Sequence, residues 1–87
     1  MTTDQGLIQS FLEIKIAETG ASKNTIAAYE RDLNDFKMWL QANRIKLLKV
    51  TQKQIESYLV GQEQKGFAPT TRARRLSVIK QLSLIHI

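Results

Sequence analysis

The sequence has 87 residues, 43% of them hydrophobic, which fits one small globular domain and excludes a disordered tail. It has no cysteine and a single histidine, which excludes disulfides and cysteine-based metal sites, and we expect no cofactor. The net charge of +5 is unevenly distributed: residues 44–87 carry +7, from nine Lys or Arg and two Asp or Glu, whereas residues 1–43 carry −2, from four Lys or Arg and six Asp or Glu.

This segregation of charge suits a polyanionic partner such as nucleic acid. No apolar run approaches the ~20 residues that a membrane helix needs. The polar, acidic start "MTTDQG" is not a secretory signal. We therefore expect a cytoplasmic protein without a membrane partner.

The first predicted helix covers about residues 4–19. Asp4 is a suitable N-cap, because its carboxylate can accept hydrogen bonds from the first turn. Gly20 supplies the left-handed residue that commonly follows a helix. Apolar residues recur at steps of three and four and form one face: Leu7, Ile8, Phe11, Leu12 and Ile14.

The second predicted helix has the strongest apolar pattern, begins after the N-cap Ser22 and ends near Asn43. Its stripe contains Ile26, Tyr29, Leu33, Phe36, Trp39 and Leu40. Because it is the longest and most aromatic helix, we expect it at the centre of the domain. We expect the opposite side to face solvent, with Glu30, Arg31, Asp35 and Lys37.

A connector, "RIKLLKV", leads to the third predicted helix and should be anchored by Ile45, Leu47, Leu48 and Val50. Thr51 and Gln54 have the spacing of a capping box at the start of this helix. Its short apolar face consists of Ile55, Tyr58 and Leu59, and Gly66 ends it.

The fourth predicted helix opens at Pro69, because proline suits the first helical position. Its inward residues, at steps of three, are expected to be Ala73, Leu76, Ile79 and Leu82. The apolar end "SLIHI" leads us to expect that this turn packs on the domain or that another domain follows. Four amphipathic helices with short connections predict a compact all-α bundle.

An outward stripe is predicted on the fourth helix. Thr70, Arg74, Ser77 and Gln81 recur at i, i+4, i+7 and i+11, with Thr71 and Arg75 beside them. No Asp or Glu follows Glu63, so this face lacks the opposite-charge pairs that usually stabilise a solvated helix. Arg, Gln, Ser and Thr on a helix can contact bases and phosphates in a major groove. The simpler interpretation is that this face is exposed to solvent and that its Arg and Lys residues are there because they are good helix formers.

A second patch is predicted at "SKNT", residues 22–25, where the second helix begins. Free backbone N–H groups, the positive end of the helix dipole and Lys23 make such an end suitable for phosphate. Plain capping by Ser22 explains the same residues without a ligand.

The ordered pattern across the chain resembles the N-terminal core-binding domain of the tyrosine recombinases, the phage-integrase family. The segments are "SKNTIAAYERDLNDFKMWL", "LLKVTQKQIESYL" and "KGFAPTTRARRLSVIKQL". The matching residues are Ser22, Thr25, Tyr29, Asp32, Leu33, Phe36, Trp39, Val50, Thr51, Ile55, Tyr58, Leu59, Gly66, Arg74, Arg75, Leu76 and Ser77.

The resemblance implies a four-helix, SAM-like orthogonal bundle that forms one half of a clamp around recombination-site DNA. Its second and fourth helices would face the major groove. The residues expected on DNA are Ser22, Lys23, Asn24, Thr25, Thr70, Thr71, Arg74, Arg75, Ser77, Lys80 and Gln81.

The family's catalytic domain, with its arginines, histidines and nucleophilic tyrosine, lies C-terminal to this domain. Residues 1–87 are therefore expected to be one core-binding domain, a fragment of a longer recombinase and not itself an enzyme. Tyr29 and Tyr58 lie on apolar faces and are not candidates for the nucleophile. The expected partners are double-stranded DNA and the catalytic domain of the same chain. The isolated domain should be a monomer, and the parent protein should assemble on DNA.

Two other functions fit the residues. A helical protein-interaction module would use the basic helix to bind an acidic partner. A helix-turn-helix regulator would use the third and fourth helices, joined through "KGFAPT", and would bind a palindrome as a dimer. A stand-alone enzyme is not expected, because the sequence has no catalytic constellation, Gly-rich phosphate loop or metal-ligand spacing.

Overall fold

The computed structural model describes residues 4–85, with side chains described for residues 4–82. Its helices are α1 (Asp4–Thr19), α2 (Lys23–Ala42), the 3-10 turn η1 (Leu47–Lys49), α3 (Gln52–Gln64) and α4 (Pro69–Ile85). The described part of the chain contains no strand. The predicted all-α bundle of four helices is therefore confirmed. The predicted packing of "SLIHI" lies outside the described side chains.

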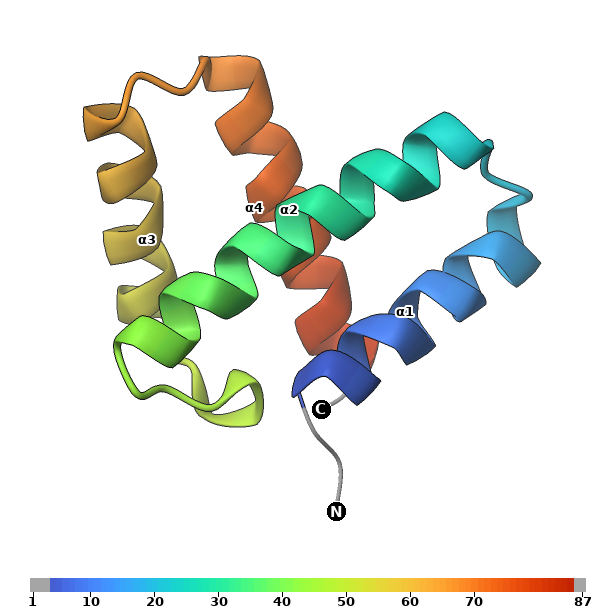
Figure 1. The fold of residues 1–87 in the computed structure, drawn as a ribbon, viewed down its shortest axis with the longest axis horizontal. Coiled ribbons are helices and arrows are strands. Elements are labelled where there is room, and N and C mark those ends of the chain that lie inside the picture. Colours follow the sequence, from blue (N-terminus) through green and yellow to red (C-terminus); the bar gives the residue numbers. More distant parts are fainter. Residues whose placement is uncertain (1–3, 86–87) are drawn as a thin grey trace.

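Helix α2 runs diagonally across the molecule, and the other helices pack around it (Figure 1). Helices α1 and α3 lie on opposite sides, while α4 crosses behind α2 and contacts α1, α2 and α3. The central place of α2 is as predicted, and it makes this helix the frame on which the residues of α4 are held.

Local hydrogen bonds fix the start of α2 and both ends of α3 where the sequence predicts them, whereas Asp4, predicted as the N-cap of α1, is the first residue of that helix and its carboxylate accepts the Leu47 N–H. The Ser22 side chain accepts the Thr25 N–H at 3.2 Å, and Thr51 and Gln54 form the complete capping box. Gly66 has a φ of +85°, which lets the Phe67 N–H turn back to the carbonyl of Gln62 at 3.1 Å. This is the Schellman arrangement, in which a left-handed residue satisfies the last carbonyls of a helix.

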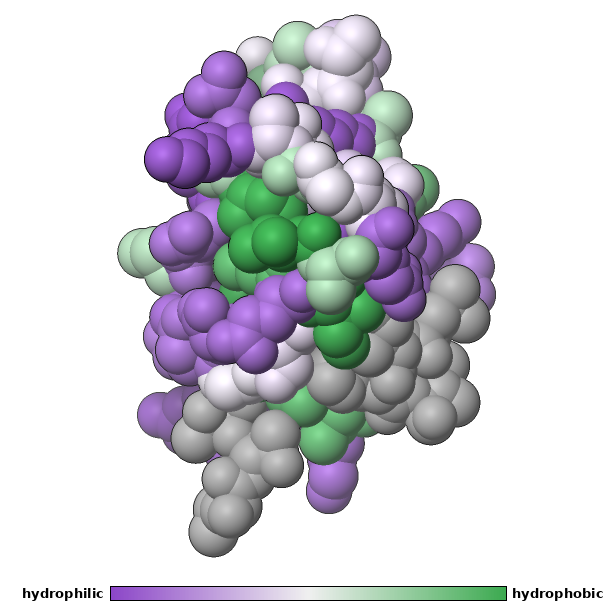
Figure 2. All heavy atoms as spheres, turned by 90° about the vertical axis from the view of Figure 1, so that its right-hand side faces the viewer, coloured by the Kyte–Doolittle hydropathy of each residue, from purple (hydrophilic) through white to green (hydrophobic). Residues whose placement is uncertain are grey.

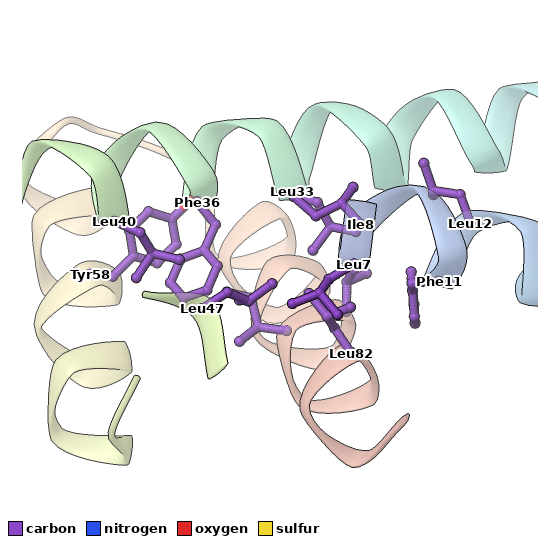
Figure 3. Close-up of a cluster of buried hydrophobic side chains, with 12 residues drawn as sticks. Leu7, Ile8, Phe11, Leu12, Leu33, Phe36, Leu40, Leu47, Tyr58 and Leu82 are labelled. Atoms are coloured by element: carbon purple, nitrogen blue, oxygen red, sulfur yellow. The ribbon is translucent and has the colours of Figure 1, made fainter. Parts of the chain in front are cut away.

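The core lies beneath α2 (Figure 3). At one end Phe36 packs edge-to-face on Tyr58, with ring centroids 4.9 Å apart, and stacks beside Trp39 at 6.2 Å. Each fully buried large apolar side chain contributes about 1.5–3 kcal/mol. The buried hydrophobic residues are Leu7, Ile8, Phe11, Leu12, Leu33, Phe36, Leu40, Leu47, Tyr58, Val78, Ile79 and Leu82.

Two predictions about apolar faces are only partly correct, because Leu47 of the connector and Ile79 and Leu82 of α4 are buried as predicted but their expected neighbours are not. In the connector, Leu47 is buried but Leu48 is 59% exposed. In α4, Ala73 is exposed and Leu76 is only half-buried, whereas the buried residues are Arg75, Val78, Ile79 and Leu82. The helix is rotated from its expected orientation because Arg75 points inward to Asp32 and Asp35 of α2. A pattern of apolar residues cannot predict the burial of an arginine.

The side of the molecule where α1 ends and α2 begins is not uniformly polar. Figure 2 shows an apolar area in the middle of this face, bordered by hydrophilic side chains. On α1, Ile16 is 51% exposed, which is unusual for a large aliphatic residue but not by itself a binding site.

Candidate nucleic-acid interface

A buried carboxylate on α2 holds two arginines of α4. Asp32 is 2% exposed, and both of its oxygens accept hydrogen bonds. Arg74 donates from Nε to Oδ2 at 2.7 Å and from Nη2 to Oδ1 at 3.0 Å, while Arg75 donates from Nε to Oδ1 at 3.1 Å. A buried charge is tolerated only when it is paired and hydrogen-bonded in this way. The contact fixes α4 against α2.

A second carboxylate extends the network to α3. Asp35 Oδ2 accepts from the Tyr58 hydroxyl at 2.5 Å, from Gln62 Nε2 at 3.2 Å and from Arg75 Nη1 at 3.2 Å. Burial and the hydrogen bond to Asp35 raise the pKa of Tyr58 well above its usual range. The prediction that Asp35 lies on the solvent side of α2 is thus wrong, because it is half-buried among these partners.

Arg75 does not flank the exposed stripe of α4. Its side chain is 10% exposed, also donates from Nη1 to the side-chain amide oxygen Oε1 of Gln62, and lies over the Phe67 ring at 4.5 Å from the centroid. The expectation that it lies beside the stripe on the surface is therefore corrected. The guanidinium of Arg75 binds groups within the protein, because the carboxylates of Asp32 and Asp35 and the side-chain amide of Gln62 surround it.

The rest of the predicted stripe lies at the surface of α4. Thr70, Arg74 and Ser77 are exposed, whereas Gln81 and the flanking Thr71 are half-buried; Lys80, which is expected on DNA but is not a member of the stripe, is also exposed. Gln81 Nε2 donates to Ser77 Oγ at 3.2 Å, which links two neighbouring turns of the stripe. The structure thus brings together the predicted polar and basic residues of this helix, with Arg75 excepted.

Arg74 is the exposed residue of this stripe that is most firmly held. Its side chain is 46% exposed, although its bonds to Asp32 fix one edge of the guanidinium and raise its pKa. A guanidinium has five N–H donors, and the two bonds to Asp32 use two of them. The remaining donors can bind an anion while the side chain stays oriented.

The second predicted patch, Ser22–Thr25, lies at the first turn of α2. Ser22, Lys23 and Asn24 are exposed, and the Ser22 hydroxyl lies 3.0 Å from that of Thr25. The capping role of Ser22 is confirmed by its bond from the Thr25 N–H. In Figure 1 the first turns of α2 and α4 both lie toward the upper edge of the molecule.

The described residues contain neither a membrane-spanning helix nor a cluster of metal-binding side chains. None of their helices is long and apolar enough to cross a membrane. Within the same part of the chain, no three His, Cys, Asp or Glu side chains gather as a metal ion would require.

Comparison with known proteins extends these observations. The family described as "Phage integrase, N-terminal SAM-like domain" matches residues 8–83. Proteins named tyrosine recombinase XerD are similar: that of Vibrio cholerae is 32% identical over 94% of this chain and 27% of its own length. The Agrobacterium fabrum protein is 38% identical over 90% of this chain and 24% of its own length. The Brucella abortus protein is 40% identical over 85% of this chain and 24% of its own length. The chain therefore spans about a quarter of these curated relatives. No solved structure matches significantly.

Proposed function

Because the chain belongs to the family of phage-integrase N-terminal SAM-like domains, we propose that it is the DNA-binding module of a site-specific tyrosine recombinase. It binds recombination-site duplex as one half of a clamp and does no chemistry itself. Cleavage and rejoining of DNA belong to a catalytic domain of the longer protein, which positions its reacting groups on the duplex that this module holds.

The observation that carries the proposal is the acid-free, exposed face of α4. Thr70, Ser77 and Lys80 are exposed on this face, and no Asp or Glu follows Glu63 in the sequence. A polyanion can approach this face without repulsion from a carboxylate on the same helix. An α-helix also has the width that a major groove admits.

The residues have different parts in the proposed contact. Arg74, Thr70, Thr71, Ser77, Lys80 and Gln81 would face the groove, and Ser22–Thr25 would hold phosphates at the start of α2. Arg75 is included as a positioning residue. Because Asp32 binds Arg74 and Arg75 together, Arg75 fixes the carboxylate that orients Arg74.

A salt titration of duplex binding tests the proposal. With about five neutralised phosphates, the logarithm of the association constant should fall against the logarithm of salt concentration with a slope near −4 to −5. Lys80→Gln should lower affinity several-fold, whereas Lys15→Gln, which removes the same charge from α1, should change it little. A slope near zero, or equal effects of the two variants, would contradict the proposal.

The other two functions make different predictions. A helix-turn-helix regulator would require a dimer on a palindromic site, and a protein-interaction module would bind an acidic protein in the absence of DNA. NMR chemical-shift mapping with a generic duplex distinguishes them. Salt-sensitive shifts at Ser22–Thr25 and Thr70–Gln81 are expected for the recombinase module.

A further inference from the structure

A second basic segment lies between α2 and α3. Between Asp35 and Glu56 the sequence has five Lys or Arg and no carboxylate. Four of these cations belong to the connector between α2 and α3 and to the first turn of α3. We call residues 44–53 the basic connector; its cations are Arg44, Lys46, Lys49 and Lys53, and all four are exposed.

These cations differ from the arginines of α4 in having no internal partner. Arg74 and Arg75 bind carboxylates of α2, and Arg72 lies 3.7 Å from Glu63. Among the described residues, none of the four side chains of the basic connector makes an ion pair or a hydrogen bond. An external anion would therefore not have to displace an internal carboxylate to bind them.

The backbone beneath these cations is anchored. Arg44 has a φ of +57° and closes α2, with its N–H bonded to Gln41 O and the Ile45 N–H bonded to Leu40 O. In the middle, Leu47 is buried in the core, and its N–H donates to Asp4 of α1 at 3.3 Å. The capping box of Thr51 fixes the other end. The four charges are thus presented by an ordered surface.

The basic connector lies at the opposite end of α2 from Ser22–Thr25 (Figure 1). Helix α2 has 20 residues and is therefore about 30 Å long. Equivalent phosphates on successive turns of a duplex are roughly 34 Å apart. The two ends of α2 are thus separated by a length close to one helical turn of DNA.

We propose that the basic connector is a second phosphate-binding surface, which contacts the DNA backbone about one helical turn from the phosphates held by Ser22–Thr25. The partner is duplex DNA and not an acidic protein, because the spacing along α2 fits the repeat of a duplex. The inference rests on the proposed function and adds to it a contact with DNA that flanks the groove contacted by α4.

The test removes the four charges and varies the length of the duplex. In the variant Arg44→Gly/Lys46→Gln/Lys49→Gln/Lys53→Gln, glycine suits the left-handed position 44. A matched control, Lys15→Gln/Arg31→Gln/Lys37→Gln/Lys65→Gln, lowers the net charge equally without touching the connector. Fluorescence anisotropy gives the affinity of the whole chain for duplexes of about 8 and about 24 base pairs, lengths chosen below and well above one turn.

On the long duplex we expect the connector variant to bind at least tenfold more weakly, with a salt slope shallower by about 2 to 3. On the short duplex the connector variant should bind nearly as tightly as the natural chain. On the long duplex the control variant should lose much less affinity than the connector variant. The proposal would be overturned if the connector variant lost the same affinity on both duplexes, or if it and the control variant lost the same affinity on the long duplex. It would also be overturned if neither variant changed binding to either duplex.

The same experiment separates this inference from the proposed function. If Lys80→Gln weakens binding to both duplexes while the connector variant has no effect, only the inference fails. If neither variant changes binding and the salt slope is near zero, the DNA-binding function itself fails. Capture of a polyglutamate peptide by the connector in preference to the long duplex would also overturn the inference in favour of an acidic protein partner.

Discussion

Arg74 and Asp32 form a two-bond contact between the surface and the interior, with an Nε–Oδ2 distance of 2.7 Å and an Nη2–Oδ1 distance of 3.0 Å. The arginine is 46% exposed, whereas the side chain of Asp32 is 1% exposed. A residue that is proposed to face DNA is therefore oriented by a carboxylate that solvent does not reach. This coupling makes the stability of the bundle and the geometry of its proposed DNA face depend on the same side chain.

Asp32→Asn should destabilise the domain strongly. The neutral amide leaves the nearly buried Arg75 with only Asp35 as its carboxylate partner and releases Arg74. Removing one partner of a buried ion pair typically costs about 3–5 kcal/mol. Urea denaturation followed by circular dichroism measures the change. Glu30→Gln, an exposed acid on the same helix, is the control and should stay within about 0.5 kcal/mol of the natural chain.

Arg74→Ala and Arg74→Lys should separate orientation from charge. Alanine should weaken duplex binding roughly tenfold, since a well-placed bidentate arginine contact is worth about 1–3 kcal/mol. It should cost about 1 kcal/mol of stability or less, because the ion pair is half-exposed and Arg75 still binds Asp32. Lysine keeps the charge but not the planar fork, so the salt slope should be retained while affinity remains reduced.

These measurements have outcomes that would contradict the assignment. If Arg74→Ala binds DNA as the natural chain does, with an unchanged circular dichroism spectrum, Arg74 is not part of the contact surface. If lysine restores full affinity, the charge alone matters and the orientation by Asp32 does not.

The local order of the chain was predictable from short sequence patterns. The N-caps Ser22 and Thr51 and the left-handed Gly66 each fix a helix end through hydrogen bonds within a few residues, and Pro69 takes the first position of α4. These local interactions depend little on the rest of the fold, so the bounds of the four helices can be predicted from them. The apolar stripe of α2 then predicts which helix lies at the centre.

The polar network was not predicted, because it depends on the contact of three helices. A charged residue is normally placed on the surface, so Arg75 was expected outside and Asp35 on a solvated face. One signal was present: Asp32 immediately precedes Leu33 and lies within the stripe of apolar residues on α2. A carboxylate at such a place requires a cationic partner, and the Arg-Arg pair of α4 supplies it.

Tyr58 should make stability fall at alkaline pH. Its pKa is raised in the folded state by burial and by the hydrogen bond to Asp35, so its contribution is fully present below the ordinary tyrosine pKa of about 10. As the pH rises above about 10, the unfolded chain ionises first, and stability declines until the folded pKa is passed. The difference in unfolding free energy between the natural chain and Tyr58→Phe, measured at pH 7 and pH 11, isolates this residue from the lysines. A difference that does not change with pH would contradict the assignment.

Two glycines of the α3 region provide opposite tests of the backbone. Gly66 has a φ of +85°, a conformation that alanine adopts only with strain, whereas Gly61 lies inside α3 with nothing within 4 Å of the position of an added Cβ. Gly66→Ala should therefore destabilise the domain by about 1–2 kcal/mol. Gly61→Ala should stabilise it by about 0.5–1 kcal/mol, since alanine is the better helix former. Both changes add one methyl group at a position with open space, so packing does not distinguish them. Thermal unfolding of the two variants should shift the midpoint in opposite directions, and a midpoint of Gly66→Ala that is not lowered would show that the end of α3 is not set by the left-handed residue.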